Sequence, residues 1–453
     1  MYFICHIWSN GKHQRMWSSP LKLDSKMQNL NSTNSPYKHF FQHEVHILGC
    51  TALGCLIFTM KFFKKTEENV FFGFNIMVLK ACGLWPDLID YRYDKWRLMK
   101  DCLMISSLMP CAVPIMADFI MQLYDGVPNL TAAVENMIAL NCIIGMIYMV
   151  ICFIANRRTI IKLMVNLKYF NKYGNSRKTK EVDEKANLFS KIFMFYGILG
   201  NFVYMLMPQL SIDKCHNNRT AKMIDDGVPC GLVVRSVFPF KFDYKPVFEI
   251  IFVHQIYTCT MVSIVVLALT MLLCGFLMHI VNQLKNLREF IAKLRHCPQD
   301  KPGERLFFII QYHIDVIEYS QNTAKAFSTM LLFYITLTSL VLSVLCFEVI
   351  MVDAFEDSVR FALHLVGWLA ILLSVCYNGQ LMIDESVEVA NDIYSLNWFN
   401  FPVGIQKKIQ MIIMRSQKPL ILDAAGMGLV SLPAFLKVLS SAYSFFTLLL
   451  KLK

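Results

Sequence analysis

Long stretches without a charged residue recur along the chain, and polar segments separate them. A helix needs about 20 mostly apolar residues to cross a bilayer. The pattern predicts seven membrane-spanning helices over Cys102–Ala117, Asn136–Asn156, Ile192–Ile212, Ile250–Leu284, Ala326–Phe347, Phe361–Ile383 and Pro433–Leu450. The first stretch is short and contains Pro110 and Pro114, so we expect Asp118 to lie near an interface or to face protein. The fold class is therefore an all-α membrane protein.

Amphipathic segments adjoin the last four predicted spans. Apolar positions repeat at helical spacing in Asn282–Arg295, Glu304–Lys325, Asp384–Asn397 and Ile405–Met414. Such faces need burial, so we expect a packed bundle outside the membrane, built from spans 4 to 7. The alternative is that these helices lie on the membrane surface. Acidic residues such as Asp384 and Glu385 argue against contact with an anionic leaflet.

The last span carries a polar stripe. A break is predicted between Lys418 and Pro433, because Pro419, Gly426 and Gly428 interrupt the helical pattern. At about 100° per residue, one face then collects Lys437, Ser440, Ser441, Ser444, Thr447 and Lys451. A polar stripe on an apolar span belongs against water or protein, so it is either an ion path or a helix-packing surface. Leu448 is the large apolar residue inside this polar arc.

Charge sets the predicted orientation. The chain has 453 residues, is 55% hydrophobic and 17% charged, and has a net charge of +11. Residues 157–191 hold ten Lys or Arg and residues 285–305 hold six, whereas the loops after spans 1 and 5 hold almost none. Because cytoplasmic loops are rich in Lys and Arg, we expect a cytoplasmic N-terminus and an extracellular C-terminus. Nucleic-acid binding is a poor interpretation, since no basic stretch stands apart from the spans.

Modification sites follow from this orientation. Asn129 and Asn218 begin glycosylation sequons in loops predicted to be extracellular, and Cys215 and Cys230 share one such loop and could pair or stay reduced. No Cys/His cluster with metal spacing, catalytic triad or cofactor motif occurs, so we expect no metal, no cofactor and no enzymatic activity. Residues 1–70 form an N-terminal extension, which we interpret first as the product of a mispredicted start; an uncleaved signal-like segment and an interfacial helix are the alternatives.

Three segments carry a resemblance to the insect odorant receptors, of the ligand-tuned kind and not the co-receptor. They are LKACGLWP (79–86) before span 1, IYSLNWF (393–399) after span 6, and SQKPLILDAAGMGLVSLPAFLKVLSSAYSFFTLLL (416–450). The match covers about residues 71–453, and its C-terminal part is the most specific. Asp423 and Ala425 depart from the commoner Thr and Gly of the family. Residues 71–400 would hold spans 1 to 6, and residues 401–453 a cytoplasmic helix and the pore helix.

The resemblance implies a non-selective cation channel that a volatile ligand opens. The family assembles as a heterotetramer with its co-receptor in the plasma membrane of sensory-neuron dendrites, with span 7 lining the pore. Its gate-forming apolar positions fall on Leu448 and Leu452, and Lys451 stands where the co-receptor carries a neutral amide. We therefore expect the ion path to follow Ser440, Ser444 and Thr447.

The resemblance also places an odorant pocket in the outer half of spans 2, 3, 4 and 6. The candidate residues are Met137, Asn141 and Ile144; Tyr196, Gly200, Tyr204 and Met205; His254, Tyr257 and Met261; and Phe361, His364 and Trp368. For each of them ordinary packing is the competing interpretation. Two other functions stay open, a receptor coupled to G proteins and a transporter. The predicted orientation opposes the first, and only span 7 is broken, which opposes the second.

Overall fold

The computed structural model describes residues 71–86, 95–126, 130–174, 176–210, 212, 217, 230–240, 242, 244–294, 302–352, 355–426 and 428–451. Within these ranges the chain is almost entirely helical, and the β contacts are limited to an isolated bridge between Asp423 and Leu429. The fold is therefore all-α, as predicted. Leu452, Cys215, Asn129, Asn218 and residues 1–70 lie outside the described ranges.

Seven helices in the described part of the chain are long and apolar enough to cross a membrane, which confirms the predicted number. They are α5 with α6 (Lys95–Ser106 and Met109–Tyr124), α7 (Leu130–Asn166), α8 (Ser176–Leu210), α11 (Val247–Leu294), α12 (Pro302–Met351), α13 (Phe355–Tyr394) and α15 (Leu432–Lys451). The remaining elements are α4 (Gly73–Ala81), the 3-10 turns η2 (Leu167–Tyr173) and η3 (Trp398–Asn400), and α14 (Val403–Ser416).

The first span is divided in two by its proline-containing sequence. Pro110 lies in the first turn of α6, where a missing backbone N–H removes no helical hydrogen bond. Asp118 is 1% exposed and accepts hydrogen bonds from Gln122, Asn136 and Arg235, with its Oδ1 3.1 Å from Arg235 Nε. The carboxylate therefore faces protein, which is the second of the two expected placements. Because Arg235 belongs to the segment 230–240, this pair also ties that segment to α6.

The N-terminal signature has a packing role. Leu79 at the end of α4 and the following Leu84 are fully buried, and Trp85 is 6% exposed with its ring 6.2 Å from that of Phe153. The helix α4 packs against α8 and α11. Burial of these side chains fixes the chain against the bundle immediately before the first span.

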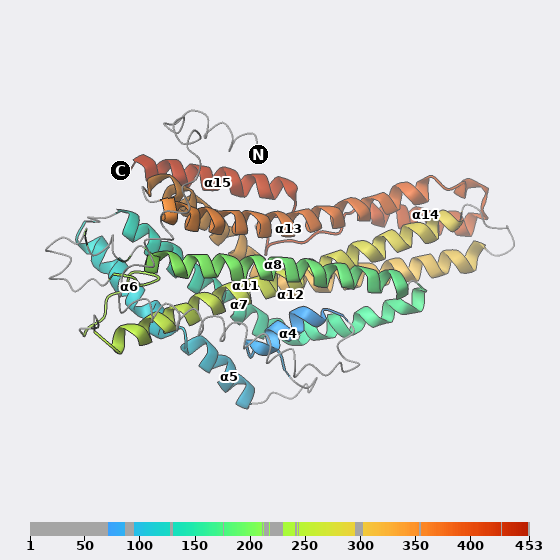
Figure 1. The fold of residues 1–453 in the computed structure, drawn as a ribbon. Helices are drawn as coiled ribbons and strands as arrows, with labels where there is room; N and C mark the ends of the chain where they lie inside the picture. The colour runs from blue at the N-terminus through green and yellow to red at the C-terminus, as the bar shows by residue number, and fades with distance from the viewer. Residues whose placement is uncertain are drawn as a thin grey trace, which may run out of the picture. The chain divides into compact units, whose positions relative to one another are not determined.

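The helices α11, α12 and α13 are far longer than a bilayer requires. They contain 48, 50 and 40 residues, against about 20 for a span. Their extensions pack on one another, and those of α12 and α13 also pack on α14, as Figure 1 shows near the α14 label. Tyr312 stacks on Tyr173 at 4.0 Å between ring centroids, and its hydroxyl donates to Gln283 at 2.7 Å. The amphipathic faces are thus buried against protein.

An ion-pair cluster joins α11 to α13 in this bundle. Arg288 donates to Asp392 through Nε and to Glu385 through Nη1, both at 2.6 Å. On α14, Ile409 and Ile412 are buried, whereas Lys407 and Lys408 are exposed. Glu385, one of the acidic residues that argued against a membrane surface, therefore pairs with a basic residue of the same chain.

The helical break before the last span is a short linker that other helices hold in place. The helix α14 ends at Ser416 and α15 begins at Leu432. Ser386 Oγ accepts from Leu420 N at 2.9 Å, and Ser328 Oγ accepts from Ala425 N at 2.9 Å. Ala425 has a φ of 50°, which is strained for a residue with a Cβ. A glycine, the commoner family residue there, would suit this position better.

Candidate functional site

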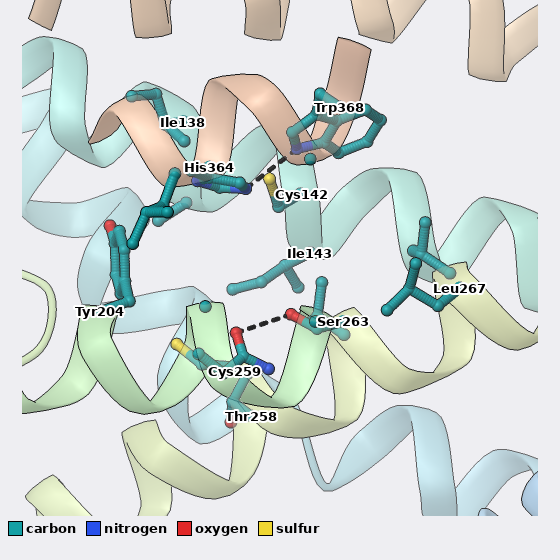
Figure 2. A pocket seen from close by; sticks show the side chains of 18 of the residues that line it. Ile138, Cys142, Ile143, Tyr204, Thr258, Cys259, Ser263, Leu267, His364 and Trp368 are labelled. Carbon is teal, nitrogen blue, oxygen red and sulfur yellow. Dashed lines mark hydrogen bonds between the residues drawn. The ribbon is translucent and has the colours of Figure 1, made fainter. Parts of the chain in front are cut away.

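A cavity of about 150 Å³ lies between α6, α7, α8, α11 and α13, and Val234 of the segment 230–240 also lines it. Figure 2 shows side chains around this space, with Tyr204 at one end and Leu267 at the other. The segment 230–240 is fixed by Gln255 of α11, whose Oε1 accepts from Val233 N at 3.0 Å. A disulfide at Cys230 also restrains it. The part of the wall that Val234 forms is therefore held in place.

The cavity wall is mainly apolar with a few polar groups, as small-molecule sites usually are. Its apolar part includes Ile138, Ile143, Val262 and Leu267, and its polar part includes Asn201, Ser263, Arg360 and His364. An enclosed apolar cavity of about this volume holds a molecule the size of benzene. The space therefore suits a small organic ligand and is too small for a peptide.

Five of the predicted pocket residues line this cavity. They are Tyr196, Gly200, Tyr204, His364 and Trp368. On α8 they follow a spacing of four residues, so they share one face of the helix. On α13, His364 and Trp368 are also four apart, and Trp368 Nε1 donates to His364 Nε2 at 2.9 Å. The structure brings these residues to one site, from two helices far apart in sequence.

The three residues predicted on α11 do not line this cavity. His254 lies 3.0 Å from the carbonyl oxygen of Ser107, and Tyr257 lies with its hydroxyl 3.1 Å from Ser107 Oγ. Met261 is absent from the cavity wall, to which α11 contributes Thr258, Cys259, Val262, Ser263, Val266 and Leu267. His254 and Tyr257 therefore contact Ser107, at the break in the first span, and do not line the cavity.

Five further predictions fall outside the cavity. Met137 and Phe361 pack in a neighbouring hydrophobic cluster, and Met205 is buried at 3% exposure. Ile144 is 44% exposed on the outer side of α7, and Asn141 lines a second, much smaller cavity beside α12. In each case the residue type suited a ligand site but the helix turns the side chain elsewhere.

Sequence reasoning missed Asn201, Ser263 and Arg360. The first two are polar residues inside spans otherwise free of charge, which is itself an indication of function. Ser263 Oγ donates to Asn201 Oδ1 at 2.9 Å across the α8–α11 interface. Arg360 lies one turn before His364 on α13, so the same helical face that suggested His364 and Trp368 also contains it.

Arg360 is a buried cation at the edge of the cavity. It is 6% exposed, and its Nη2 donates to Glu135 Oε1 at 2.9 Å and lies 3.5 Å from Asp357 Oδ1. Its guanidinium carbon lies 4.8 Å from the centre of the Tyr204 ring and 4.5 Å from that of Phe361. Paired and stacked in this way, the guanidinium is held rigidly.

A hydrophobic cluster connects the cavity wall to α15. It contains Val134 and Ile138 of α7, Phe361 of α13 and Phe446 of α15 in one contiguous set with side chains of α12. Tyr204 and Trp368, which line the cavity, pack against the same cluster. The cavity wall and the buried face of α15 therefore share one packed cluster.

Among the described residues, the other face of α15 has no cover. Val438, Ala442 and Phe446 are buried, whereas Ser440, Ser444, Leu448 and Lys451 are exposed, with Leu448 at 55%. The hydroxyls of Ser444 and Thr447 donate to carbonyls of the same helix at 3.0 and 2.8 Å. The stripe is thus not a packing surface within the described part of this chain. Figure 1 shows α15 alongside α13, which supports one side of it.

Of the predicted disulfide and glycosylation sites, only Cys230 lies among the described residues. Cys230 is disulfide-bonded, while Cys215 lies outside the described residues, so their pairing stays a prediction. Asn129 and Asn218 also lie outside them. Among the described residues, no group of three or more His, Cys, Asp or Glu side chains is placed to hold a metal ion.

Comparisons with known proteins agree on one family. The family model described as "7tm Odorant receptor" matches residues 129–443. Odorant receptor 30a of Drosophila melanogaster is 24% identical over 270 residues, which cover 60% of this chain and 68% of that protein. Odorant receptor 82a of the same fly is 22% identical over 309 residues, 66% of this chain and 78% of that one.

Solved structures share the fold. The insect olfactory receptor OR5 from Machilis hrabei, in complex with eugenol, superposes with a TM-score of 0.69 at 17% identity. The match covers 84% of this chain and 97% of that one. The structure of the same receptor described without eugenol gives a TM-score of 0.68. The arrangement of helices described above is therefore one that an insect olfactory receptor also adopts.

Proposed function

This chain belongs to the 7tm odorant receptor family, and we propose that it is the ligand-tuned subunit of an odorant-gated, non-selective cation channel. It would act with a co-receptor in the plasma membrane of sensory-neuron dendrites. The chain is a multi-pass membrane receptor and not an enzyme. The similar Machilis receptor was solved in complex with eugenol, which supports a small volatile as the ligand here.

One observation carries the proposal. The cavity wall and the buried face of α15 belong to the same hydrophobic cluster, through Ile138, Phe361 and Phe446. A ligand shifts an equilibrium only by its differential affinity for the two states. A volatile that fits the cavity better in one packing of this cluster would favour the matching position of α15. The cluster is thus the mechanical link between ligand and gate.

The exposed polar face of α15 is the proposed ion path. A row of hydroxyls flanked by a large apolar side chain suits a pore with a hydrophobic constriction, which gates by excluding water. Leu448 would form that constriction, and Ser440, Ser444 and Thr447 would line the path. Because the described part of this chain leaves the face open, subunits of a tetramer would complete the pore. The linker before Leu432 is where α15 would pivot.

The topology separates a channel of this kind from a receptor coupled to G proteins. The distribution of Lys and Arg supports a cytoplasmic N-terminus and an extracellular C-terminus. Epitope tags at the two ends of the chain, probed with antibodies on intact and permeabilised cells, should stain the C-terminal tag without permeabilisation. Surface staining of the N-terminal tag on intact cells would contradict the channel proposal.

The proposed function is tested by co-expressing the chain with a co-receptor and recording currents in cells. A panel of volatiles should evoke an inward cation current that needs both subunits and persists in excised patches without GTP. A response that disappears on blocking G proteins would contradict the proposal. Cells that express the co-receptor alone are the matched control.

Replacing Lys451 with glutamine should raise single-channel cation conductance. Lys451 is exposed at the end of the stripe, where a positive charge opposes cation entry. At separations of about 4–10 Å in water, one charge changes the local cation concentration roughly two- to five-fold. The gain should shrink in high salt because screening shortens the range of the charge. Identical conductance at low salt would place Lys451 away from the ion path. Lys418→Gln, in the linker, is the control.

A further inference from the structure

A second, smaller cavity lies beside the first one, with walls from α7, α11, α12 and α13. Its volume is about 10 Å³, against about 150 Å³ for the first cavity. Its wall is mainly apolar, with polar groups from Asn141 and Tyr334 and apolar side chains such as Met146, Met149 and Leu337. A space of this volume holds one group about the size of a water molecule, and a water needs about two to four polar partners. This wall therefore suits the end of an alkyl chain better.

A single layer of side chains separates the two cavities. Cys142 of α7, Val266 of α11 and Trp368 of α13 contribute to both walls. Figure 2 shows the side chains of Cys142 and Trp368 at the first cavity. Because each of the three residues meets both spaces, the layer is one side chain thick where it divides them. A ligand in the first cavity therefore ends at these side chains on this side.

Trp368 is the largest member of the layer and is held from both sides. Its Nε1 donates to Nε2 of His364 at 2.9 Å, and His364 lines the first cavity. Its ring stacks on that of Tyr334 with 6.2 Å between the centroids, and Tyr334 lines the second cavity. The indole thus lies between a residue of one wall and a residue of the other, and we expect it to stay in place when a ligand binds.

Val266 is a small member of the layer, and α11 supplies a matched residue for comparison. Val266 is 7% exposed, and replacing it with alanine would remove two methyl groups from the layer. Val262 lies one turn earlier on the same helix and is 8% exposed. It lines the first cavity but not the second. The same substitution at the two positions therefore removes the same atoms, but only at Val266 does it open the layer.

Gly145 of α7 provides a way to fill the second cavity. A Cβ built there would lie 2.7 Å from Leu337 Cδ1, with no other heavy atom within 4 Å. That atom is the free end of a flexible side chain, so alanine would fit once Leu337 shifts. Both residues line the second cavity and neither lines the first. The added methyl group and the shifted side chain would therefore compete for the small space of the second cavity.

Resting on the proposed function, we propose that the layer formed by Cys142, Val266 and Trp368 sets the length limit of the ligand. The ligand would be a small volatile whose apolar body fills the first cavity and whose alkyl chain ends at this layer. A methylene that finds apolar space improves affinity about four-fold, whereas one that meets the layer gains nothing. Thinning the layer adds the second cavity to the site and admits a longer chain, and filling the second cavity removes that gain.

A series of n-alkylbenzenes, from toluene to hexylbenzene, tests this limit because only the length of the chain changes. The benzene ring matches a cavity of about 150 Å³. Binding is measured as thermal stabilisation of the purified full chain, since a ligand of the folded state raises stability. Activation is measured as current from the co-expressed channel. In the wild type, affinity should rise about four-fold per methylene up to a longest accepted homologue and then fall.

Two variants and a combination assign the limit to the layer. The homologue one methylene beyond the wild-type limit should bind Val266→Ala at least about four-fold more tightly than it binds the wild type. Val262→Ala is the matched control and measures the gain from a larger first cavity alone. Gly145→Ala, combined with Val266→Ala, should return the limit toward its original length. Combined with Val262→Ala, it should change nothing. Toluene binding shows that each variant keeps the site.

The outcomes are separable. A larger shift in Val266→Ala than in Val262→Ala, reversed by Gly145→Ala, supports the length limit. Equal shifts in the two valine variants, or a shift that Gly145→Ala leaves in place, overturn the limit and leave the ligand site intact. Length-dependent binding without current from any homologue keeps the limit and overturns the proposed function. If no homologue binds, the limit falls together with this cavity as the ligand site, while currents evoked by other volatiles would still support a channel.

Discussion

Replacing Gly200 with leucine is expected to raise the activating concentration of any volatile agonist about 10- to 100-fold, or to abolish the response. Gly200 lines the cavity, and a Cβ built there would meet nothing within 4 Å. The added isobutyl group therefore enters the ligand space and not the protein core. Overpacking a site typically costs about 1–3 kcal/mol, which corresponds to that range of affinity. Dose–response currents on the co-expressed channel measure the effect.

The fold should tolerate this change. Leucine is a better helix former than glycine by about 1 kcal/mol, and nothing opposes the side chain where it begins. Gly404→Leu on α14 is the matched control, because its Cβ would also meet nothing within 4 Å and it lies far along the chain from the cavity. An unchanged agonist response in Gly200→Leu, at equal surface expression, would exclude this cavity as the ligand site.

Replacing Leu448 with alanine is expected to raise the basal current of the co-expressed channel several-fold. Leu448 is 55% exposed, so shortening it leaves no void in the core of its own subunit. In a hydrophobic constriction the smaller side chain widens the opening and admits water, and wetting of the pore lowers the barrier to ions. The current without ligand, normalised to surface protein, measures this.

A neighbour on the same turn controls for helix stability. Leu450 follows two residues later, about 200° around the helix, and is 37% exposed. Leu450→Ala makes the same chemical change on a different face and should leave basal current near its original level. Equal basal currents in wild type and Leu448→Ala would place Leu448 off the pore and remove the main reason to treat the polar stripe as an ion path.

Some parts of the fold could be read from the sequence because a single physical rule decides them. Charge-free stretches of about 20 residues cross a bilayer as helices, because a helix satisfies its own backbone hydrogen bonds. The seven spans could therefore be located. Pro419, Gly426 and Gly428 predicted the break before α15, and both glycines have a positive φ in the structure. Asp118 was more difficult, since only the structure shows Arg235 and Asn136 beside it.

Predicting which residues line the cavity required knowing which face of each helix is turned toward it. On α8, Tyr196, Gly200 and Tyr204 reached the cavity because their face is the one that α13 and α11 cover. On α11 the chemistry of the side chains favours His254 and Tyr257, whereas the cavity is lined by the face with Cys259 and Ser263. The run from Ile250 to Leu284 contains no charged residue that would mark which side of α11 meets a ligand.

The central claim is that ligand in the cavity controls an ion path along α15, and cysteine accessibility tests it most directly. Ser444→Cys, co-expressed with a co-receptor, is exposed to a cationic methanethiosulfonate reagent from outside, with and without an activating volatile. The unsubstituted chain, whose Cys102 is exposed, and Ala442→Cys, a position buried at 5% exposure, are the controls. Modification of Cys at 444 should change the current irreversibly and proceed faster with the volatile. A current that is insensitive to modification at 444, or equally sensitive at 442, would contradict the claim.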